Sequence, residues 1–478
     1  MSKRILMIGA GAIGLSAALH CARKGHRVTV LERNGPQRNG CSFGNAGMIV
    51  PSHFVPLAAP GMVKLGLKWM LNPESPFYIK PRFDWELFDW ALKFWRASNA
   101  EHVRRSAPLL RDLNFASRAL FEEFAGAMAA ELPESGVVTG QRENSPSHSR
   151  IEPRNCNRRR EEALTSVHEF QMEPPHVGCY EVRGEGRHAI GDFGLVTRGL
   201  LMLCKTPHAL EDEASFATQA NQLGVPAEVL DAKQVARLDP GVTMDVTGAV
   251  YFPKDAHFIP DRYLAALQNE CEKLGVSFVW NAEARRLKGA MNQLAAVNTN
   301  AGDFEFDELV LCGGAWSPLL VRELGVRIPI QAGKGYSLTL SQPCELPQLC
   351  SIFAEARLAV TPMGSSLRFG GTMEMAGLTE EINPVRVRGI LKAVPNYFPK
   401  FSPADFADIE PWRGLRPCSP DGLPYLGRTA KYSNLVIATG HAMMGMSLSP
   451  ITGKLVGEIV SGEKPSFDLS LLSPDRFA

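Results

Sequence analysis

The sequence predicts an α/β fold of two domains, one built on a parallel sheet and one built on a large, mostly antiparallel sheet with helices. Three observations predict it. A glycine-rich turn follows an apolar run near the N-terminus, apolar runs that end in glycine return at 308–316 and 434–440, and residues 336–340 alternate in polarity. Apolar runs followed by glycine occur near both chain ends, so we expect the two ends to share one domain. The second domain would then be inserted between them.

The N-terminal motif predicts a Rossmann-like dinucleotide site. Gly9, Gly11 and Gly14 have the G-x-G-x-x-G spacing between the apolar run 4–8 and a helix, and Glu32 closes a return strand at 28–31. Gly9 permits the tight turn, Gly11 lets backbone approach a pyrophosphate, and Gly14 lets the helix pack closely. Glu32 would accept hydrogen bonds from an adenosine ribose. The motif does not decide between NAD and FAD, and a purely structural turn is the alternative.

Composition limits the classes of function. The chain has 478 residues, is 45% hydrophobic and carries a net charge of +1, so it can bury a large core in two or three domains and lacks a basic field for nucleic acid. Its ten cysteines show neither a C-x-x-C pair nor metal-site spacing, so we predict no metal site and reduced, buried thiols. The sequence begins with a predicted strand rather than a signal peptide, and it has no apolar run of about 18 residues. These two observations predict a cytoplasmic protein.

An aromatic segment at 54–96 holds four of the seven tryptophans. Leu87, Trp90, Phe94 and Trp95 follow helical spacing. Packing inside the second domain is one interpretation of this stripe. The other is a surface for a partner or for the inner face of the plasma membrane, because aromatic and basic side chains together suit an interface.

Residues 128–190 differ from the rest of the chain. They carry eight arginines, three of them consecutive at 158–160, and no lysine. We interpret the segment as a poorly ordered insertion whose charge run is solvated or contacts an anionic partner, or as a sequence artefact.

The other elements follow in order. We expect a helix over 106–130 and, further along, a new region at 325–340 that has the turn Gly333-Lys334-Gly335 before its strand. A helix should begin directly after the strand 434–440. The remaining expected elements are strands at 199–204, 276–280, 308–316, 336–340 and 358–371, and helices at 208–223 and 261–274.

Six motifs carry a resemblance to a known family. They are GAGAIGLSAA with Glu32 and Arg33, FGNAGMIVP, LCGGAWSP, GKGYSLT, WRGLRPCSPDGLPYLG and ATGHAMMGMSLSPITGKLVGEIVSG. Together they resemble the FAD-dependent D-amino-acid oxidase superfamily, with its glutathione-reductase-like FAD-binding part, and most closely the bacterial D-amino-acid dehydrogenases of the small-subunit type. The resemblance covers most of the chain except about 128–190. It implies an FAD-binding domain of 1–53, 255–327 and 408–478, and a substrate domain of 54–254 and 328–407.

The resemblance implies non-covalent FAD, although Cys418 lies near the position where sarcosine-oxidase relatives attach flavin. A helix beginning under the flavin would stabilise the negative charge of its reduced form. The implied FAD-binding residues are Gly9, Ala10, Gly11, Ala12, Ile13, Gly14, Glu32, Arg33, Ser42, Asn45, Ala46, Gly47, Met48, Ala284, Gly313, Gly314, Ala315, Gly414, Gly440, His441, Met443, Met444, Gly445, Met446 and Ser447.

Four residues are the candidate catalytic groups. Arg416 matches the guanidinium that binds the substrate carboxylate in glycine oxidase, where its planar fork gives two parallel hydrogen bonds. Tyr336 is a second contact for the carboxylate or amine, unless it only packs in its strand. His441 and His53 are candidates for flavin or substrate contact, against the alternative of ordinary loop histidines.

The implied reaction is oxidation of a D-amino acid, or of a cyclic relative such as D-proline or hydroxy-D-proline. Relatives transfer the Cα hydrogen of a neutral amine as hydride to flavin N5, and water hydrolyses the imine to a 2-oxo acid and ammonia. The acceptor would be a quinone or respiratory chain rather than oxygen. A glycine or sarcosine oxidase, and a non-catalytic FAD-binding assembly protein, are the alternatives.

Overall fold

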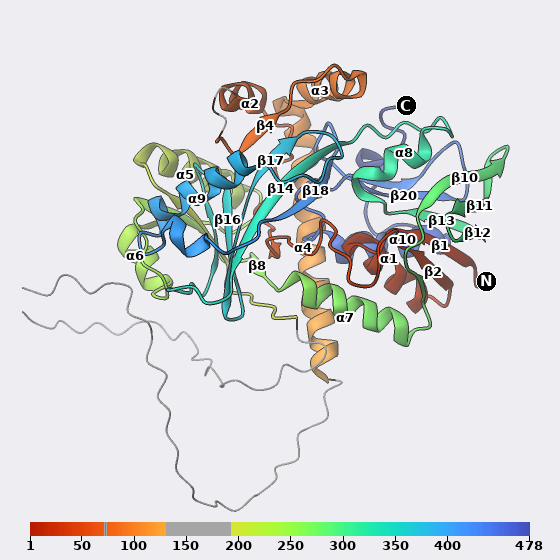
Figure 1. Cartoon of the computed structure of the whole chain (residues 1–478), viewed down its shortest axis with the longest axis horizontal. Helices are drawn as coiled ribbons and strands as arrows, with labels where there is room; N and C mark the ends of the chain where they lie inside the picture. The colour runs from red at the N-terminus through yellow and green to blue at the C-terminus, as the bar shows by residue number, and fades with distance from the viewer. Residues whose placement is uncertain (71, 73, 131–192) are drawn as a thin grey trace, which may run out of the picture.

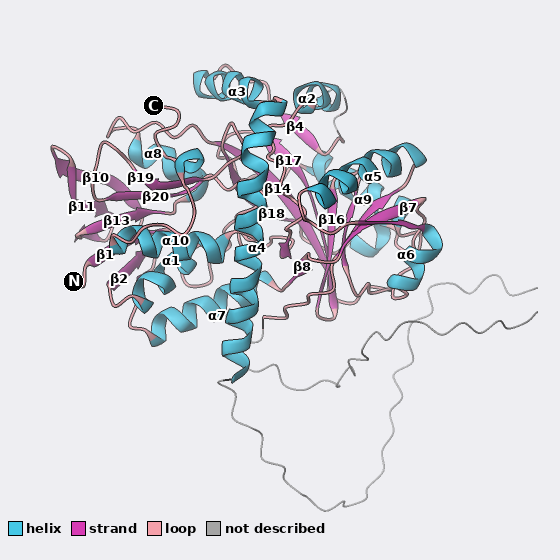
Figure 2. Ribbon diagram, turned by 180° about the vertical axis from the view of Figure 1, so that it is seen from behind, coloured by secondary structure: helices cyan, strands magenta, loops and turns pink. Residues whose placement is uncertain are grey.

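The structure is a computed structural model that describes residues 1–70, 72, 74–130 and 193–478 (Figure 1). Most of the predicted insertion at 128–190 lies outside the described residues. Two sheets stand beside each other, and helix α4 (Ala100–Ala130) runs between them along one side of the molecule (Figure 2). This arrangement confirms the predicted α/β class with a parallel and a mostly antiparallel sheet.

The smaller sheet has six strands and is parallel except at one edge. β1 pairs with β2 and with β13, where Leu309 lies opposite Leu6. β13 pairs in turn with β20, so both chain ends build one sheet. In spatial order the strands are β19 (Tyr425–Arg428), β20 (Leu435–Thr439), β13 (Glu308–Leu311), β1 (Arg4–Ile8), β2 (Arg27–Leu31) and β9 (Ser277–Val279).

Helices cover one face of this sheet and a small sheet covers the other. α1 packs tightly on α10 because Gly453 has no side chain: a Cβ there would lie 2.5 Å from the backbone of Ser16. The helices are α1 (Ala12–Arg23), α7 (Pro260–Lys273) and α10 (Ser449–Ser461), and the small antiparallel sheet is β10 (Ala284–Ala290), β11 (Gln293–Thr299) and β12 (Gly302–Glu305), with α8 (Ser317–Val321) beside it.

The larger sheet has nine strands, and all but two of its pairings are antiparallel. One of its faces packs on α9 (Pro384–Tyr397), and the other packs on α5 (Pro207–Gln222) and the core shared with the smaller sheet. Its strands are, in spatial order, β18 (Trp412–Cys418), β14 (Gln331–Leu340), β17 (Ser366–Met375), β16 (Leu358–Met363), β15 (Cys350–Phe353), β5 (Leu200–Cys204), β7 (Gly248–Phe252) and β6 (Glu228–Asp231), with β4 (Phe77–Ile79) on β17.

Side chains at helix starts explain several boundaries. Asp84 caps α3 (Trp85–Ala97) by accepting hydrogen bonds from two backbone amides of its first turn. Thr206 caps α5 in the same way, and Asp231 forms a capping box with Gln234 at α6 (Ala232–Leu238). Each cap satisfies amides that lack a partner within the helix. α2 (Met62–Met70) and α3 project from the larger sheet near β4 (Figure 1).

Two expectations about elements need correction. Residues 333–335 are not a turn but lie inside β14, because their glycines make room for a side chain from β18. The last helix begins at Ser449, nine residues after Gly440, because Gly440 and Ala442 have positive φ angles that break the helix. The domain ranges stay a prediction; β18, from the range predicted for the FAD-binding domain, pairs with β14 of the larger sheet.

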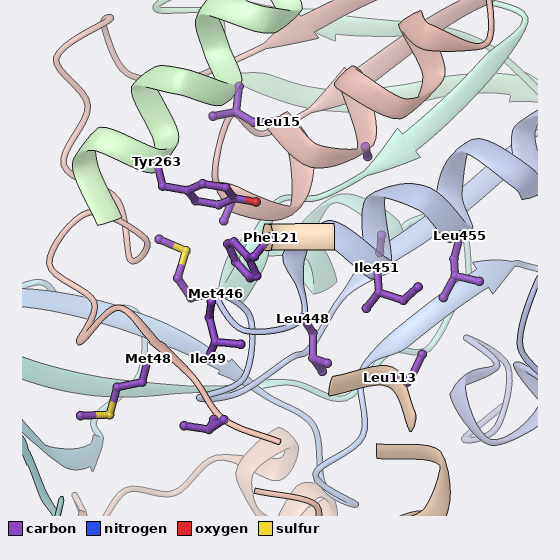
Figure 3. Close-up of a cluster of buried hydrophobic side chains, with 14 of the residues drawn as sticks. Leu15, Met48, Ile49, Leu113, Phe121, Tyr263, Met446, Leu448, Ile451 and Leu455 are labelled. Carbon is purple, nitrogen blue, oxygen red and sulfur yellow. The ribbon is translucent and has the colours of Figure 1, made fainter. Parts of the chain in front are cut away.

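One apolar core joins the two parts of the molecule (Figure 3). Phe121 of α4 is fully buried, and its ring lies 4.9 Å from that of Tyr263 on α7. The short strand β3 (Met48–Ile49) and the loop before α10 contribute to the same core, and β3 pairs with β8 (Ala256–His257). The core therefore holds the loops at 42–48 and 440–447 in fixed positions. Its labelled members are Leu15, Met48, Ile49, Leu113, Phe121, Tyr263, Met446, Leu448, Ile451 and Leu455.

Candidate functional site

The glycine-rich turn between β1 and α1 accepts only glycine at two positions. Gly9 has a φ of +103°, and a Cβ there would lie 2.6 Å from the carbonyl oxygen of Cys312. A Cβ at Gly14 would lie 1.9 Å from the carbonyl oxygen of Gly9. Gly11 is the N-cap of α1 and has no side chain of its own to cap the helix, and the first turn holds no acid. The positive end of α1 therefore suits a pyrophosphate.

Glu32 lies buried at the end of β2. One carboxylate oxygen accepts a hydrogen bond from the amide of Ala10 at 2.9 Å, and the other accepts two from Asn34. Arg38 is also buried and donates to the carbonyl of Ala10 and to Gln268. These bonds hold the carboxylate next to the glycine-rich turn, where it could bind a ribose.

The loop 42–48 is tied down at several points. Ser42 Oγ accepts from the amide of Ala12 at 3.1 Å, and Asn45 Oδ1 accepts from the amide of Gly47 at 2.8 Å. Arg368 of β17 donates to the carbonyl of Asn45 at 2.8 Å. The loop thus connects the start of α1 to the larger sheet, with Ala46 between Asn45 and Gly47, and Met48 paired with His257.

A cavity of about 180 Å³ opens beside these loops. The guanidinium of Arg33 stacks over the ring of Trp316, 3.6 Å from its centroid, in the short helix that follows Gly313. Predicted cofactor residues contribute to the lining or adjoin it. The lining residues are Arg33, Asn34, Asn39, Gly40, Cys41, Trp316, Glu380, Arg413, Gly414 and Leu415, while Gly314 and Ala315 lie directly before Trp316.

Trp412 explains two of the glycines beside this cavity. A Cβ at Gly44 would lie 2.0 Å from its indole, and a Cβ at Gly414 would lie 2.2 Å from it. The indole also donates a hydrogen bond to Asn39. Ala284 lies further away, at the start of β10, where it pairs with Thr299.

The loop 440–447 crosses from β20 to α10. Ser447 accepts a hydrogen bond from the amide of Val50 and donates one to Asn114 of α4. His441 is buried, and its Nε2 lies 3.0 Å from Thr452 Oγ1. Burial lowers the pKa of His441 to about 3, so the ring is neutral at physiological pH. Met446 is in the core, whereas Met443 is 46% exposed, and Met444 and Gly445 lie between them.

Arg416 lies across the glycines of β14. A Cβ at Gly335 would lie 2.2 Å from both terminal nitrogens of the guanidinium, which explains the glycine. Nη1 donates to the carbonyl of Thr372 at 2.7 Å. Within the described part of the chain, no other hydrogen bond to this guanidinium is formed, so its remaining donors are free for a ligand. Ser337, on the same face of β14, donates to the carbonyl of Gly44 in the loop 42–48.

Tyr336 is on the opposite face of β14. Its hydroxyl donates to Glu374 at 2.6 Å, and it accepts from the amide of Asn383. Burial and then Glu374 raise the pKa of this phenol. The structure does not bring Tyr336 together with Arg416, because successive residues of a strand point to opposite faces.

His53 belongs to a hydrogen-bonded chain. Its Nδ1 lies 2.9 Å from Ser52 Oγ, and Ser52 donates to the buried carboxylate of Asp255 at 2.5 Å. Burial lowers the pKa of His53 to about 4 and raises that of Asp255 to about 7. The Ser52 hydroxyl has one proton, so it accepts from Nδ1–H, and Nε2 keeps a lone pair. Nε2 has no hydrogen-bond partner among the described residues.

Cys418 is fully buried, with its sulfur close to where a Cβ at Gly333 would lie. Burial raises the pKa of its thiol to about 12. A neutral, buried thiol is a poor nucleophile, which fits the expectation of non-covalent flavin.

Sequence reasoning missed the residues that hold the site in place. No motif singled out Arg38, Ser52, Asp255, Arg368 or Thr372. Asp255 lies 203 residues from Ser52 in the sequence, and Arg368 lies 323 residues from Asn45. Only Ser52 had a signal, since it adjoins a candidate histidine.

Comparison with known proteins gives a family match over most of the chain. The model of the family described as "FAD dependent oxidoreductase" (DAO) matches residues 4–189 and 183–459. The glycine-rich turn, the open start of α1 and the carboxylate of Glu32 are the features that FAD requires at its pyrophosphate and ribose.

Curated relatives align over nearly the full length. D-amino acid dehydrogenase of Granulibacter bethesdensis is 27% identical over 99% of this chain and 100% of its own, and that of Bradyrhizobium diazoefficiens is 28% identical over 99% of each. Among solved structures, glycine oxidase from Geobacillus kaustophilus has a TM-score of 0.70 at 21% identity over 100% of both chains. L-proline dehydrogenase from P. horikoshii has a TM-score of 0.65 at 16% identity over 100% of this chain and 98% of its own.

Proposed function

The chain belongs to the FAD-dependent oxidoreductase family, and we propose that it oxidises a D-amino acid, or a cyclic relative such as D-proline or hydroxy-D-proline, to the imino acid and hence the 2-oxo acid. Two relatives named D-amino acid dehydrogenase, aligned over 99% of the chain, support this substrate class. The observation that carries the proposal is Arg416, a half-buried guanidinium with free donors.

The position of Arg416 suits the carboxylate of an amino acid. The guanidinium rests on Gly335, and the face of β14 that it covers also contacts the cofactor loop through Ser337. Two parallel hydrogen bonds from a planar fork would fix the carboxylate and therefore the direction of the Cα–H bond. Bound FAD would supply the two-electron acceptor for that hydrogen.

His53 is the proposed contact for the substrate amine. An amino acid is oxidised as the neutral amine, and burial lowers the pKa of His53 to about 4, so the neutral imidazole can accept a hydrogen bond from that amine. Nε2 of His53 has the lone pair for this hydrogen bond because Ser52 and Asp255 hold the other nitrogen protonated. His441 is proposed as a structural group of the flavin loop, since its Nε2 is already engaged with Thr452.

The proposed electron acceptor is a quinone or a respiratory-chain component. Exposed aromatic side chains on and beside α3 support contact with a membrane surface that would hold such an acceptor. Trp90 and Leu87 are buried, so the aromatic stripe has both a packed and an exposed side. Within the described residues no helix is both long and apolar enough to cross a bilayer. The exposed side chains are Leu67, Phe83, Trp85, Phe88 and Trp95.

The test of function is anaerobic reduction of the bound flavin. Purified holoprotein is mixed with each D-amino acid, D-proline, hydroxy-D-proline, glycine and sarcosine, and the flavin absorbance is followed. We expect bleaching by one or more D-amino acids or D-prolines. Bleaching by glycine or sarcosine alone would identify the oxidase alternative, and no bleaching by any compound would refute catalysis.

Arg416 variants test the site itself. With Arg416→Ala, we expect KM for the reducing amino acid to rise about 100-fold, because a charged hydrogen-bond pair contributes a few kcal/mol. Arg416→Lys should recover only part of this loss, since lysine lacks the fork. FAD content should stay unchanged. Arg388→Ala, which removes an exposed arginine of α9, is the control. An unchanged KM in Arg416→Ala would exclude Arg416 from the site.

A further inference from the structure

Strand β17, whose Thr372 contacts Arg416, contains a β-bulge opposite β14. β14 and β17 pair Tyr336 with Gly371 and Lys334 with Glu374, so Gly335 on β14 faces two residues, Thr372 and Met373, on β17. A bulge bends its strand and changes where its side chains point, and bulges concentrate beside active sites. This bulge lies where the guanidinium of Arg416 crosses the sheet.

Thr372 has an unusual backbone conformation for its type. Its φ is +63°, in the left-handed region that favours glycine. A β-branched residue is disfavoured there, so the surrounding structure must hold it in place. The two side chains that follow Thr372 along β17 have contacts elsewhere. Met373 lies 3.2 Å from the place of a Cβ at Gly333, and Glu374 accepts a hydrogen bond from Tyr336.

Thr372 has two polar groups beside its contact with Arg416. Its carbonyl accepts the 2.7 Å hydrogen bond from Nη1, which fixes the plane of the guanidinium. Its hydroxyl is buried and has no hydrogen-bond partner among the described residues. An unpaired buried hydroxyl is unfavourable unless a ligand completes it, and this one sits on the same residue that holds the guanidinium.

We propose that Thr372 is a positioning and specificity residue of the substrate site: its carbonyl orients Arg416, and its hydroxyl donates a hydrogen bond to the substrate carboxylate. This inference rests on the proposed function, in which Arg416 binds that carboxylate. The carboxylate would then accept two hydrogen bonds from the guanidinium and a third from the threonine. A bulge with a glycine would supply only the first two.

Three variants separate the hydroxyl from the backbone. Thr372→Val keeps the shape and the β-branch but loses the hydroxyl, Thr372→Gly relieves the positive φ and loses it too, and Thr372→Ser keeps it. Thr361→Val is the matched control, because the buried hydroxyl of Thr361 on β16 likewise lacks a partner among the described residues. FAD content and melting temperature are measured for each protein.

The readouts are the KM and kcat of flavin reduction and the dissociation constant of benzoate, followed by its perturbation of the flavin spectrum. We expect Thr372→Val and Thr372→Gly to raise both the KM and the benzoate constant about 10-fold or more, with kcat changed much less, and Thr372→Ser and Thr361→Val to stay near wild type. If Thr372→Gly behaves as wild type, or if Thr372→Ser is as weak as Thr372→Val, the proposal is overturned.

The two readouts separate this inference from the proposed function. If no amino acid reduces the wild-type flavin, the function fails, while the benzoate titration still tests Thr372. If wild type is reduced by a D-amino acid and all three Thr372 variants bind benzoate as wild type does, the function stands and the role of Thr372 is refuted.

Discussion

His53 is given one protonation pattern by two neighbours. Ser52 uses its single proton on Asp255, so it can only accept from the imidazole. Asp255 itself is buried, and the cation of Arg118 only partly offsets the cost of its charge. Several charged or titratable groups therefore influence this chain of residues: Arg118 of α4, Arg357 before β16, and the thiol of Cys350 on β15.

The raised pKa of Asp255 predicts that the free energy of unfolding depends on pH. Its pKa is raised from 3.8 to about 7 in the folded protein, so its protonated form is favoured by folding. The contribution to stability is complete below the unfolded pKa and is lost as pH rises through about 7. Relative to Asp255→Asn, wild type should therefore lose unfolding free energy between pH 4 and 7, by an amount on the order of a few kcal/mol.

The measurement is urea unfolding of both holoproteins with excess FAD across this pH range. Asp261→Asn is a control in an exposed carboxyl at the start of α7. A constant difference between wild type and Asp255→Asn would contradict the raised pKa.

Strand β14 has a different task on each face. On the face that contacts Gly44 through Ser337, Gly333 and Gly335 leave room for Arg416 and for Cys418. On the other side, Lys334 and Tyr336 are buried against Glu374, and Lys334 also donates to the carbonyl of Glu381. The alternation of glycine with large polar residues thus combines an open face with an anchored one.

Gly335→Ala should therefore impair substrate binding without touching the substrate directly. The new Cβ would lie 2.2 Å from the guanidinium nitrogens and must displace them. We expect KM to rise about 10-fold or more while FAD remains bound, since the carboxylate contact is a charged hydrogen bond. Gly126→Ala, where a Cβ meets nothing within 4 Å, is the control. A wild-type KM in Gly335→Ala would show that the guanidinium does not need this position.

Helix α3 leads to a prediction about membranes. Trp85, Phe88 and Trp95 are each more than 60% exposed. If they enter a lipid surface, wild type should sediment with vesicles of anionic phospholipid, and the triple serine variant should bind at least about 10-fold more weakly because three aromatic side chains lose apolar burial. Met291→Ser, which removes an exposed side chain in a distant hairpin, is the control. Equal sedimentation of wild type and the triple variant would refute this surface.

The whole molecule brings together the proposed FAD-binding segments, which are far apart in the chain. The turn after β1, the loop 42–48, the cavity beside Trp316 and the loop before α10 meet through a single core and through Ser447, which contacts Val50 and Asn114. FAD bound there should stabilise the folded chain as a unit.

Removing FAD should lower stability by mass action. At free FAD of about 100 times its dissociation constant, the holoprotein should gain about 3 kcal/mol over the apoprotein, seen as a higher melting temperature. Acid precipitation should release the flavin into the supernatant, because Cys418 is buried and protonated. A pellet that stays yellow would reveal covalent attachment.

The sequence by itself determined the fold class and the glycine-rich turn between β1 and α1. Gly9, Gly14 and Glu32 act through backbone only a few residues away or through adjacent strands, so a local pattern was enough. Local patterns also located most helices and strands. They failed at residues 333–335, where two glycines imitate a turn but are required by a side chain from β18.

Tertiary structure alone decided how the candidate catalytic residues are arranged. It put Tyr336 on the face away from Arg416, joined Asp255 to Ser52 across 203 residues, and created the bulge at Thr372. These features depend on strand register and on which face of a sheet is turned to the cofactor. A one-residue change of register would reverse every face, and such a change leaves no trace in the local composition of a strand.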